Sequence, residues 1–256
     1  MDSDRKKREV FHFLFLEWLL RISDPKLYIV KGGVNLRFFF HSPRYSEDMD
    51  IDVLGGAVHT LKKNGYKILE DAAFSRSLRM YGIDRLLVND SSKAKQTETV
   101  QRFRVRLVTS AGEELPTKIE FSRRIKESLS HLVDRVDPEI ARTYQRLAFP
   151  CPHYTGESAV LQKIVALANR ELTQARDVFD LQVLADAGYL KHVKPAEVLK
   201  RSTLVEAGKN LHLLTHEDFA GHVLEYLEDV DRSRYEGKEA WDSMKETVAE
   251  VLKNGD

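Results

Sequence analysis

The sequence predicts an α+β protein, with an N-terminal domain that combines a mixed β-sheet and flanking helices, and a C-terminal domain that is all helical. Two observations predict this class. Up to about residue 122, short apolar or alternating strand patterns are interleaved with helical spacing. After Pro150, and clearly from Thr155 onward, only helical periodicity continues. We therefore expect two domains, at 1–148 and 149–256.

The composition is that of an ordinary globular chain. Its 256 residues suffice for two modest cores, and 42% of them are hydrophobic and 31% charged. Lys+Arg and Asp+Glu both number 40, so no global field attracts nucleic acid and any such contact must be local. Cys151 is the single cysteine, which excludes an internal disulfide and fits a cytoplasmic protein. No apolar run approaches the roughly 20 residues of a membrane span, so we expect no membrane association.

The elements of the first domain follow in chain order. Residues 5–22 predict an amphipathic helix that stops before the turn Ser23-Asp24-Pro25. Residues 27–30 predict a short buried strand, which Gly32-Gly33 ends while opening a helix over 35–40. The remaining patterns predict, in order, a strand at 49–54, helices at 57–64 and 69–80, and strands at 83–88, 100–110 and 115–121.

Arginine alternates with apolar residues in the longest predicted strand, 100–110. Arg102, Arg104 and Arg106 occupy one face of it, and Phe103, Val105 and Leu107 occupy the other, as in a strand with one buried side. The arginine row suits an ordinary solvated face, which is the commoner meaning of a charge run. It also suits a polynucleotide contact, which Arg123, Arg124 and Lys126 would extend.

Three aspartates share one face of the predicted strand 49–54. Asp48, Asp50 and Asp52 alternate with apolar residues that face the core. Aspartate is disfavoured in strands, and like charges one pleat apart repel each other. The pattern therefore indicates a bound cation more than a solvated face, with Asp52 as the doubtful member.

A third metal ligand is expected from another strand. Glu120 lies between Ile119 and Phe121, which point into the core, so its own side chain takes the opposite face. If this strand lies beside 49–54, Glu120 can join Asp48 and Asp50 at one divalent metal centre. Glu120 would then also be the candidate base for an attacking hydroxyl.

The glycine pair Gly32-Gly33 is weak evidence by itself, because it has neither the spacing of a Walker A motif nor that of a dinucleotide fingerprint. An ordinary strand-to-helix turn explains it equally well. Its position adds weight, since exposed amides at a helix N-terminus followed by an acidic strand would form an anion site beside a cation site. A metal-bound triphosphate requires both.

Together these motifs resemble those of the AbiEii/AbiGii toxin family of nucleotidyltransferases, which includes the MenT toxins, within the polymerase-beta-like superfamily. The resemblance covers roughly residues 27–185. It is carried by Gly32-Gly33-Val34-Asn35-Leu36-Arg37, Arg44-Tyr45-Ser46-Glu47-Asp48-Met49-Asp50, Lys118-Ile119-Glu120-Phe121, Leu161-Gln162-Lys163-Ile164-Val165-Ala166 and Arg176-Asp177-Val178-Phe179-Asp180.

The resemblance implies roles for these residues. Two Mg²⁺ ions, with Mn²⁺ as an alternative, would be held by Asp48, Asp50 and Glu120, and Lys163 and Asp180 would join these as catalytic residues. The helical domain would complete the nucleotide pocket, and the implied nucleotide-binding residues are Gly32, Gly33, Val34, Arg44, Ser46, Lys163, Arg176 and Asp177. Val34 departs from the superfamily, which usually has Ser or Thr there, so backbone amides would replace a hydroxyl contact to phosphate.

The helical residues also have a plainer interpretation. A lysine such as Lys163 on an apolar helix is more often solvated, with its stem along the apolar surface. Asp177 and Asp180 would equally serve as first-turn charges or as salt-bridge partners of Lys163 or Arg170. Only the resemblance favours a nucleotide role for them.

The function that the resemblance implies is that of a magnesium-dependent nucleotidyltransferase toxin of a type IV-like toxin–antitoxin or abortive-infection system. It would transfer NMP from an NTP to an RNA hydroxyl, with a tRNA 3′ end as the expected acceptor, and would be paired with a cognate antitoxin protein. One alternative keeps the chemistry and uses a small, antibiotic-type acceptor. Another is a nucleotide-binding module that transfers nothing.

Overall fold

The computed structural model describes residues 3–89, 97–123 and 129–253, and the chain divides into two compact units. The first, here called the sheet unit, comprises 1–39, 45–127 and 131–153. The second, the helical unit, comprises 40–44, 128–130 and 154–256. The first contains a mixed sheet with helices and the second is built from helices, which confirms the predicted α+β class.

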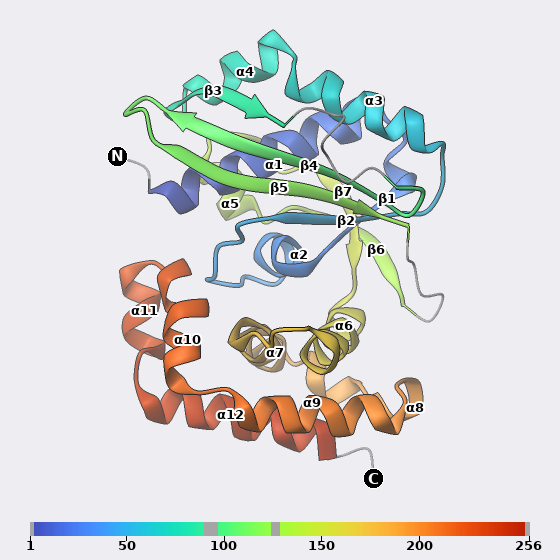
Figure 1. Ribbon diagram of the computed structural model, residues 1–256, viewed down its shortest axis with the longest axis vertical. Coiled ribbons are helices and arrows are strands. Elements are labelled where there is room, and N and C mark those ends of the chain that lie inside the picture. The colour runs from blue at the N-terminus through green and yellow to red at the C-terminus, as the bar shows by residue number, and fades with distance from the viewer. Residues whose placement is uncertain (1–2, 90–96, 124–128, 254–256) are drawn as a thin grey trace. The chain divides into compact units, whose positions relative to one another are not determined.

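A seven-stranded sheet organises the first unit, in the order β3-β4-β5-β2-β1-β7-β6 (Figure 1). β2 runs antiparallel to β1 and parallel to β5, while β4 is antiparallel to both of its neighbours. The strands are β1 (Tyr28–Lys31), β2 (Met49–Val53), β3 (Ile83–Val88), β4 (Val100–Thr109), β5 (Glu114–Ser122), β6 (His131–Arg135) and β7 (Pro150–Tyr154).

Two strands were absent from the sequence prediction. All five residues of β6 are exposed, so it shows no alternation of apolar and polar positions. β7 contains Pro150 and Pro152, and proline argues against a strand inside a sheet. β7 nevertheless pairs in parallel with β1 at Val30 and His153, so the sheet continues past the boundary expected near residue 148.

The helices of the sheet unit are α1 (Asp4–Ile22), α2 (Gly32–Phe39), α3 (Val58–Leu69), α4 (Ala72–Arg79) and α5 (Pro138–Thr143). α1, α3 and α4 lie together against the strands β3 to β5, and α2 packs on β1 and β2 (Figure 1). The break between α3 and α4 lies at Asp71, which caps α4, and not at 64–69 as expected. Gly65 lies inside α3, where a Cβ would collide with the Phe103 ring.

α1 is not the amphipathic helix that the sequence predicted. Every side chain from Val10 to Glu17 is buried, including polar ones. The buried charges have partners: Glu9 binds Arg37 and the Tyr144 hydroxyl, and Glu17 accepts from two arginines, Arg21 and Arg146. Burying a charge is tolerable when the charge is paired, so the buried polar residues of α1 form internal contacts and not a solvent-exposed face.

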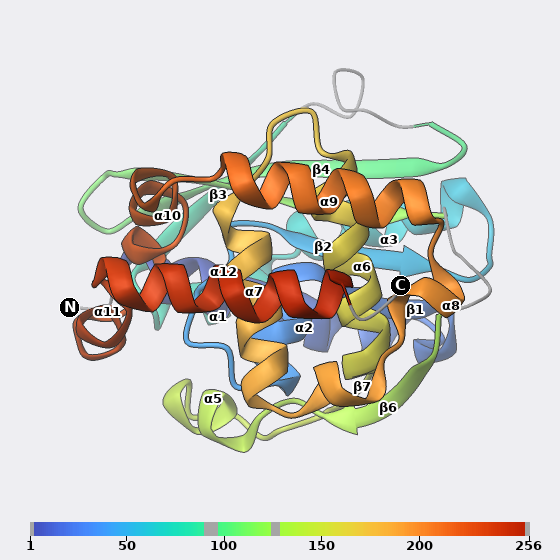
Figure 2. The ribbon, with the colours of Figure 1, turned by 90° about the horizontal axis from the view of Figure 1, so that it is seen from below.

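The helical unit contains α6 (Gly156–Asn169), α7 (Ala175–Asp186), α8 (Pro195–Val198), α9 (Arg201–Leu213), α10 (His216–His222), α11 (Asp229–Tyr235) and α12 (Lys238–Lys253). From Gly156 to Lys253 the described residues contain no strand, as predicted. α9 and α12 lie side by side and pack on α6 and α7 (Figure 2). Phe219 stacks on Trp241 in this core, with ring centroids 4.9 Å apart. None of the helices in the described ranges is long and apolar enough to cross a membrane.

His12 gives the fold a pH dependence. Its Nε2 lies 2.8 Å from the Thr117 hydroxyl oxygen, and that hydroxyl donates to the Glu47 carbonyl oxygen, so the imidazole is the donor. Burial lowers the pKa of His12 to about 4 from 6.5, while the Asp48 carboxylate opposes this shift. The unfolded chain therefore takes up a proton near pH 6.5 that the folded chain refuses until about pH 4.

We expect the stabilisation from neutral His12 to be complete above pH 6.5 and to be lost progressively as the pH falls to 4. The loss is roughly 3 kcal/mol of unfolding free energy. Denaturant unfolding at pH 7 and pH 4 would measure it, and His12→Gln should lose less than the native chain over this interval. His59→Gln, at an exposed position, is the matched control. Equal losses in the native chain and in His12→Gln would contradict the assignment.

Candidate functional site

The parallel pairing of β2 with β5 brings the predicted acids to neighbouring strands. Asp50 and Glu120 are direct cross-strand partners in this register. Asp48 stands two residues before Asp50, and its Oδ1 accepts a hydrogen bond from the Lys118 backbone amide at 3.2 Å. The strand adjacency expected for Glu120 is therefore present.

Most of these carboxylates already have a cationic partner. Lys118 Nζ lies 2.6 Å from Asp48 Oδ2, and Arg102 lies 2.5 Å from Glu120 Oε2. Asp52 is buried and bound to Lys31 Nζ at 2.5 Å. Asp52 thus has a structural partner of its own within the sheet.

Asp50 differs from the other three acids. No side chain of the described residues donates a hydrogen bond to it, although Lys31 and Lys118 act on it from a distance. Burial raises the pKa of Asp50, and the neighbouring Glu120 and Asp48 carboxylates add to this against the two lysines. Placing a negative charge here is therefore costly without a further cation.

The donor set suits a hard divalent cation, which prefers carboxylate oxygens. In this arrangement, however, no three His, Cys, Asp or Glu side chains of the described ranges are gathered as a metal cluster. Asp48 and Glu120 instead point to Lys118 and Arg102. Binding a metal would require these two carboxylates to exchange their lysine and arginine partners for it.

Gly32 is required where α2 begins. Its φ of +68° lies in the left-handed region, which costs a residue with a side chain. A Cβ on Gly32 would also lie 3.3 Å from Asp50 Oδ2. The turn therefore lets backbone amides at the start of α2 come close to the acidic strand.

The other predicted residues of this segment have distinct places. The Ser46 hydroxyl donates to the Asp48 carbonyl oxygen at 2.8 Å, so Ser46 orients the backbone of a predicted metal ligand. The Val34 side chain is buried in the core, which leaves only its backbone amide for a ligand. Asn35 is tied to β7, because its Oδ1 lies 2.9 Å from His153 Nδ1.

The helical unit gathers a second set of predicted residues into one buried charge cluster. Arg44 forms a two-pronged ion pair with Asp180, with nitrogen–oxygen distances of 3.0 to 3.2 Å. Lys163 Nζ bridges Asp180 at 2.5 Å and Asp177 at 3.1 Å, and Arg170 binds Asp177 at 2.6 Å. Arg176, which precedes Asp177 in the sequence, is partly exposed.

This cluster has the character of a structural network. Burial alone would raise the pKa of Asp180, but the Arg44 and Lys163 cations hold this pKa below its usual value. Asp177 and Asp180 are both completely buried. The salt-bridge interpretation of these residues is therefore realised in the structure, and their nucleotide role stays a prediction.

Sequence reasoning missed the cations that pair with the acids, namely Lys31, Arg102 and Lys118. A signal existed for Arg102. The alternation along its strand places Arg102 on the polar face, and Glu120 lies on the same face of the neighbouring strand. Strand order was needed to use it, since the ion pairs of Arg102 with Glu120 and of Lys31 with Asp52 depend on register.

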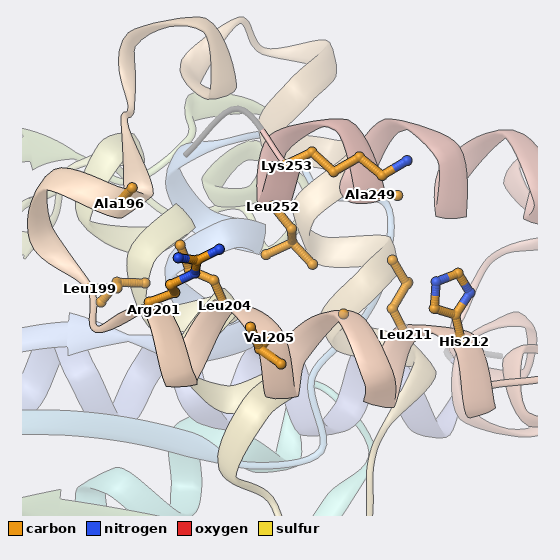
Figure 3. Close-up of a pocket in the computed structure, with 11 residues that line it drawn as sticks. Ala196, Leu199, Arg201, Leu204, Val205, Leu211, His212, Ala249, Leu252 and Lys253 are labelled. Carbon is orange, nitrogen blue, oxygen red and sulfur yellow. The ribbon is translucent and has the colours of Figure 1, made fainter. Parts of the chain in front are cut away.

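Each unit has a cavity large enough to compare with the predicted site. One of about 490 Å³ lies beside Asp48 in the sheet unit and also involves Arg104, Arg106 and Lys118. A larger one, about 650 Å³, lies between α8, α9 and α12 of the helical unit and contains none of the predicted site residues (Figure 3). The smaller cavity is the one that concerns the acids, because Asp48 belongs to its lining.

Comparison with known protein families decides the classification. A family model described as the nucleotidyl transferase AbiEii toxin of type IV toxin–antitoxin systems matches residues 14–253. The chain belongs to this AbiEii family. The comparison with curated protein sequences gives no match.

Solved structures show that the AbiEii-family chain has a known fold. JHP933 from Helicobacter pylori is 21% identical with a TM-score of 0.57, covering 99% of this chain and 95% of its own. The MenT4 nucleotidyltransferase toxin from Mycobacterium tuberculosis H37Rv is 16% identical with a TM-score of 0.63, covering 99% of this chain and 85% of its own. At these identities the likeness concerns the fold.

Family membership confirms the predicted reaction class: this AbiEii protein is a nucleotidyltransferase. Membership of a toxin–antitoxin family also implies an NTP substrate and an antitoxin partner. Nucleotidyltransferases generally use divalent metal, which agrees with the carboxylate donors of β2 and β5.

The buried charge cluster of this AbiEii protein should contribute to its stability. Asp180→Ala should lower the unfolding free energy by about 3–5 kcal/mol, because it leaves Arg44 and Lys163 buried with too little negative charge. Denaturant unfolding followed by circular dichroism would measure the loss. Asp186→Ala, an exposed site on the same helix, is the control and should change it by less than about 0.5 kcal/mol. Similar small effects for both variants would refute the structural role.

Proposed function

We propose that this AbiEii-family nucleotidyltransferase transfers a nucleoside monophosphate from an NTP to a hydroxyl of RNA, with a tRNA 3′ end as acceptor. The observation that carries the proposal is the register of β2 and β5, which makes Asp50 and Glu120 neighbours with Asp48 two residues away. The Gly32 turn beside Asp50 supplies the phosphate side of the same site.

In this proposal Asp48, Asp50 and Glu120 hold Mg²⁺, as two ions, or Mn²⁺ in its place. These carboxylates would hold the metal, and its positive charge would offset that of the triphosphate and of the departing pyrophosphate. The half-buried Asp50 fits such a role, because desolvation and two nearby carboxylates disfavour its charge in the absence of a further cation.

The protein's own residues account for the rest of the reaction. Glu120 takes the proton of the attacking RNA hydroxyl, whose oxygen forms a bond to the α-phosphorus. The bond from that phosphorus to the bridging oxygen breaks, and pyrophosphate carries away the electron pair. Amides of Gly32, Gly33 and Val34 at the start of α2 hold phosphate oxygens, which suits a helix N-terminus.

Other parts of the proposal rest on the family rather than on geometry. A cognate antitoxin would neutralise the toxin, and both would be cytoplasmic. Lys163, with Arg44, Arg176 and Asp177, would contact the nucleotide. Lys163 is held by two aspartates, and its chemistry as a point charge suits phosphate.

The carboxylates can be tested by incubating the protein with magnesium, RNA and each labelled NTP in turn. Asp48→Ala, Asp50→Asn and Glu120→Gln should each reduce label transfer by at least about 100-fold, because each removes several kcal/mol of charge stabilisation from the transition state. Asp84→Asn, an exposed acid on β3, is the control and should retain activity. Melting curves would show that all variants fold.

The outcomes separate the proposal from its alternatives. Label that enters a small hydroxyl compound but not RNA would favour an antibiotic-type transferase. Variants at Asp48 and Glu120 that keep full toxicity in cells would favour a binding module that transfers nothing. Label in tRNA that is removed by digesting its 3′ end would support the proposed acceptor.

Lys163 needs a test that separates nucleotide binding from folding. We expect Lys163→Ala to raise the KM for NTP by about tenfold, the effect of losing one charged phosphate contact. Arg170→Ala is the matched control, because Arg170 also binds Asp177 but is more exposed. If the KM for NTP rises equally in both variants, the role of Lys163 is only structural.

A further inference from the structure

We infer that the cavity over the face of β4 and β5 holds a backbone phosphate of the RNA acceptor, and that Arg104 is its principal ligand. The inference rests on the proposed transfer to RNA and names where the acceptor lies. It starts from the cavity of about 490 Å³, whose lining includes Asp48, Asn89, Arg104, Arg106 and Lys118. Because Asp48 is a predicted metal ligand, an RNA strand in this cavity would lie next to the reacting groups.

The cross-strand register makes Arg104 unusual. Arg104 on β4 stands directly opposite Lys118 on β5, and like charges directly opposite each other are destabilising. The neighbouring arginines are compensated: Arg102 binds Glu120, and Arg106 binds Glu114 at 2.7 Å. Lys118 has Asp48.

Arg104 has no such partner within the described part of the chain. It is exposed, and no carboxylate of residues 3–89, 97–123 or 129–253 forms an ion pair with it. An exposed guanidinium held next to another cation, in a cavity, is suited to an anion that arrives from outside. A phosphate oxygen pair matches the planar fork of arginine.

The lining favours a phosphodiester backbone over a base. Its residues include no aromatic ring on which a base would stack, while Arg106 and the Asn89 amide supply further donors near Arg104. Contacts to phosphate position a nucleic acid without reading its sequence. Beyond the cavity, Arg102 lies on the same face of β4, where it is paired with Glu120.

The sheet offers a physical reason for placing this charge opposite Lys118. Phe103 and Val105 bury the other face of β4, so the side chain of Arg104 has only the open face available. The repulsion between these two adjacent cations is removed when phosphate binds between them. Binding of the acceptor therefore relieves a repulsion that the free protein carries.

The test measures binding of labelled tRNA to the full chain, without NTP, by fluorescence anisotropy over 50 to 300 mM salt. We expect Arg104→Ala to weaken binding about tenfold near 0.1 M salt and to reduce the slope of log affinity against log salt by about one. Arg104→Lys should retain most of the affinity, because a point charge still binds phosphate. A structural role would not change the salt slope.

Arg142→Ala is the matched control, since Arg142 is an exposed arginine of the sheet unit outside the cavity. It should leave affinity and salt slope unchanged. Unchanged affinity and slope in Arg104→Ala, with tRNA bound normally, would overturn the inference. An equal effect of Arg142→Ala would do the same, because it would show a general effect of charge.

Failure of the inference is distinguishable from failure of the proposed function. If the native chain transfers label to tRNA and Arg104→Ala has the same KM for tRNA, only the position of the acceptor is wrong. If the native chain transfers label to no RNA, the proposed function is wrong. The inference requires that Arg104→Ala raise the KM for tRNA about tenfold and leave the KM for NTP unchanged.

Discussion

The parallel pairing of β2 with β5 is the constraint on which the acidic site depends. Each strand has its core face fixed by apolar residues that are fully buried, Met49 and Ile51 on β2 and Ile119 and Phe121 on β5. Since side chains alternate along a strand, burying these residues commits the acids to the opposite face. A shift of one residue in register would bury the acids and expose the core, which explains why the position of Asp50 beside Glu120 is secure.

Charge compensation is the second constraint. The sheet pairs Asp48, Asp52 and Glu120 with cations and leaves Asp50 with only distant ones. Such pairing keeps the acidic face stable in the free protein. The paired carboxylates can instead bind a metal, and the paired cations can instead bind a phosphate. The helical unit follows the same principle more completely at Asp177 and Asp180, which are buried and satisfied by arginine and lysine.

Alternation along strands was the most informative sequence signal. It predicted the faces of β2, β4 and β5, since period-two burial is a local property. The meeting of Glu120 with Asp50 was expected only if β5 lay beside β2, which the structure shows. β6 and β7 could not be predicted, because an exposed edge strand and a strand with two prolines have no such signature. The amphipathic interpretation of α1 was wrong for a related reason. Glu9 binds Arg37 and Glu17 binds Arg146, which lie 28 and 129 residues away, and a local pattern contains no information on these two partners.

Arg44 shows the same limit at the candidate site. Its place in a motif next to Asp48 suggested a nucleotide contact, yet it forms an ion pair with Asp180, 136 residues later in the chain. The motif around residue 44 therefore serves two compact units, with Asp48 in one and Arg44 in the other. A short segment that both presents an acid to the sheet and anchors a buried charge cluster is constrained twice, so substitutions within it would combine effects on chemistry and on stability.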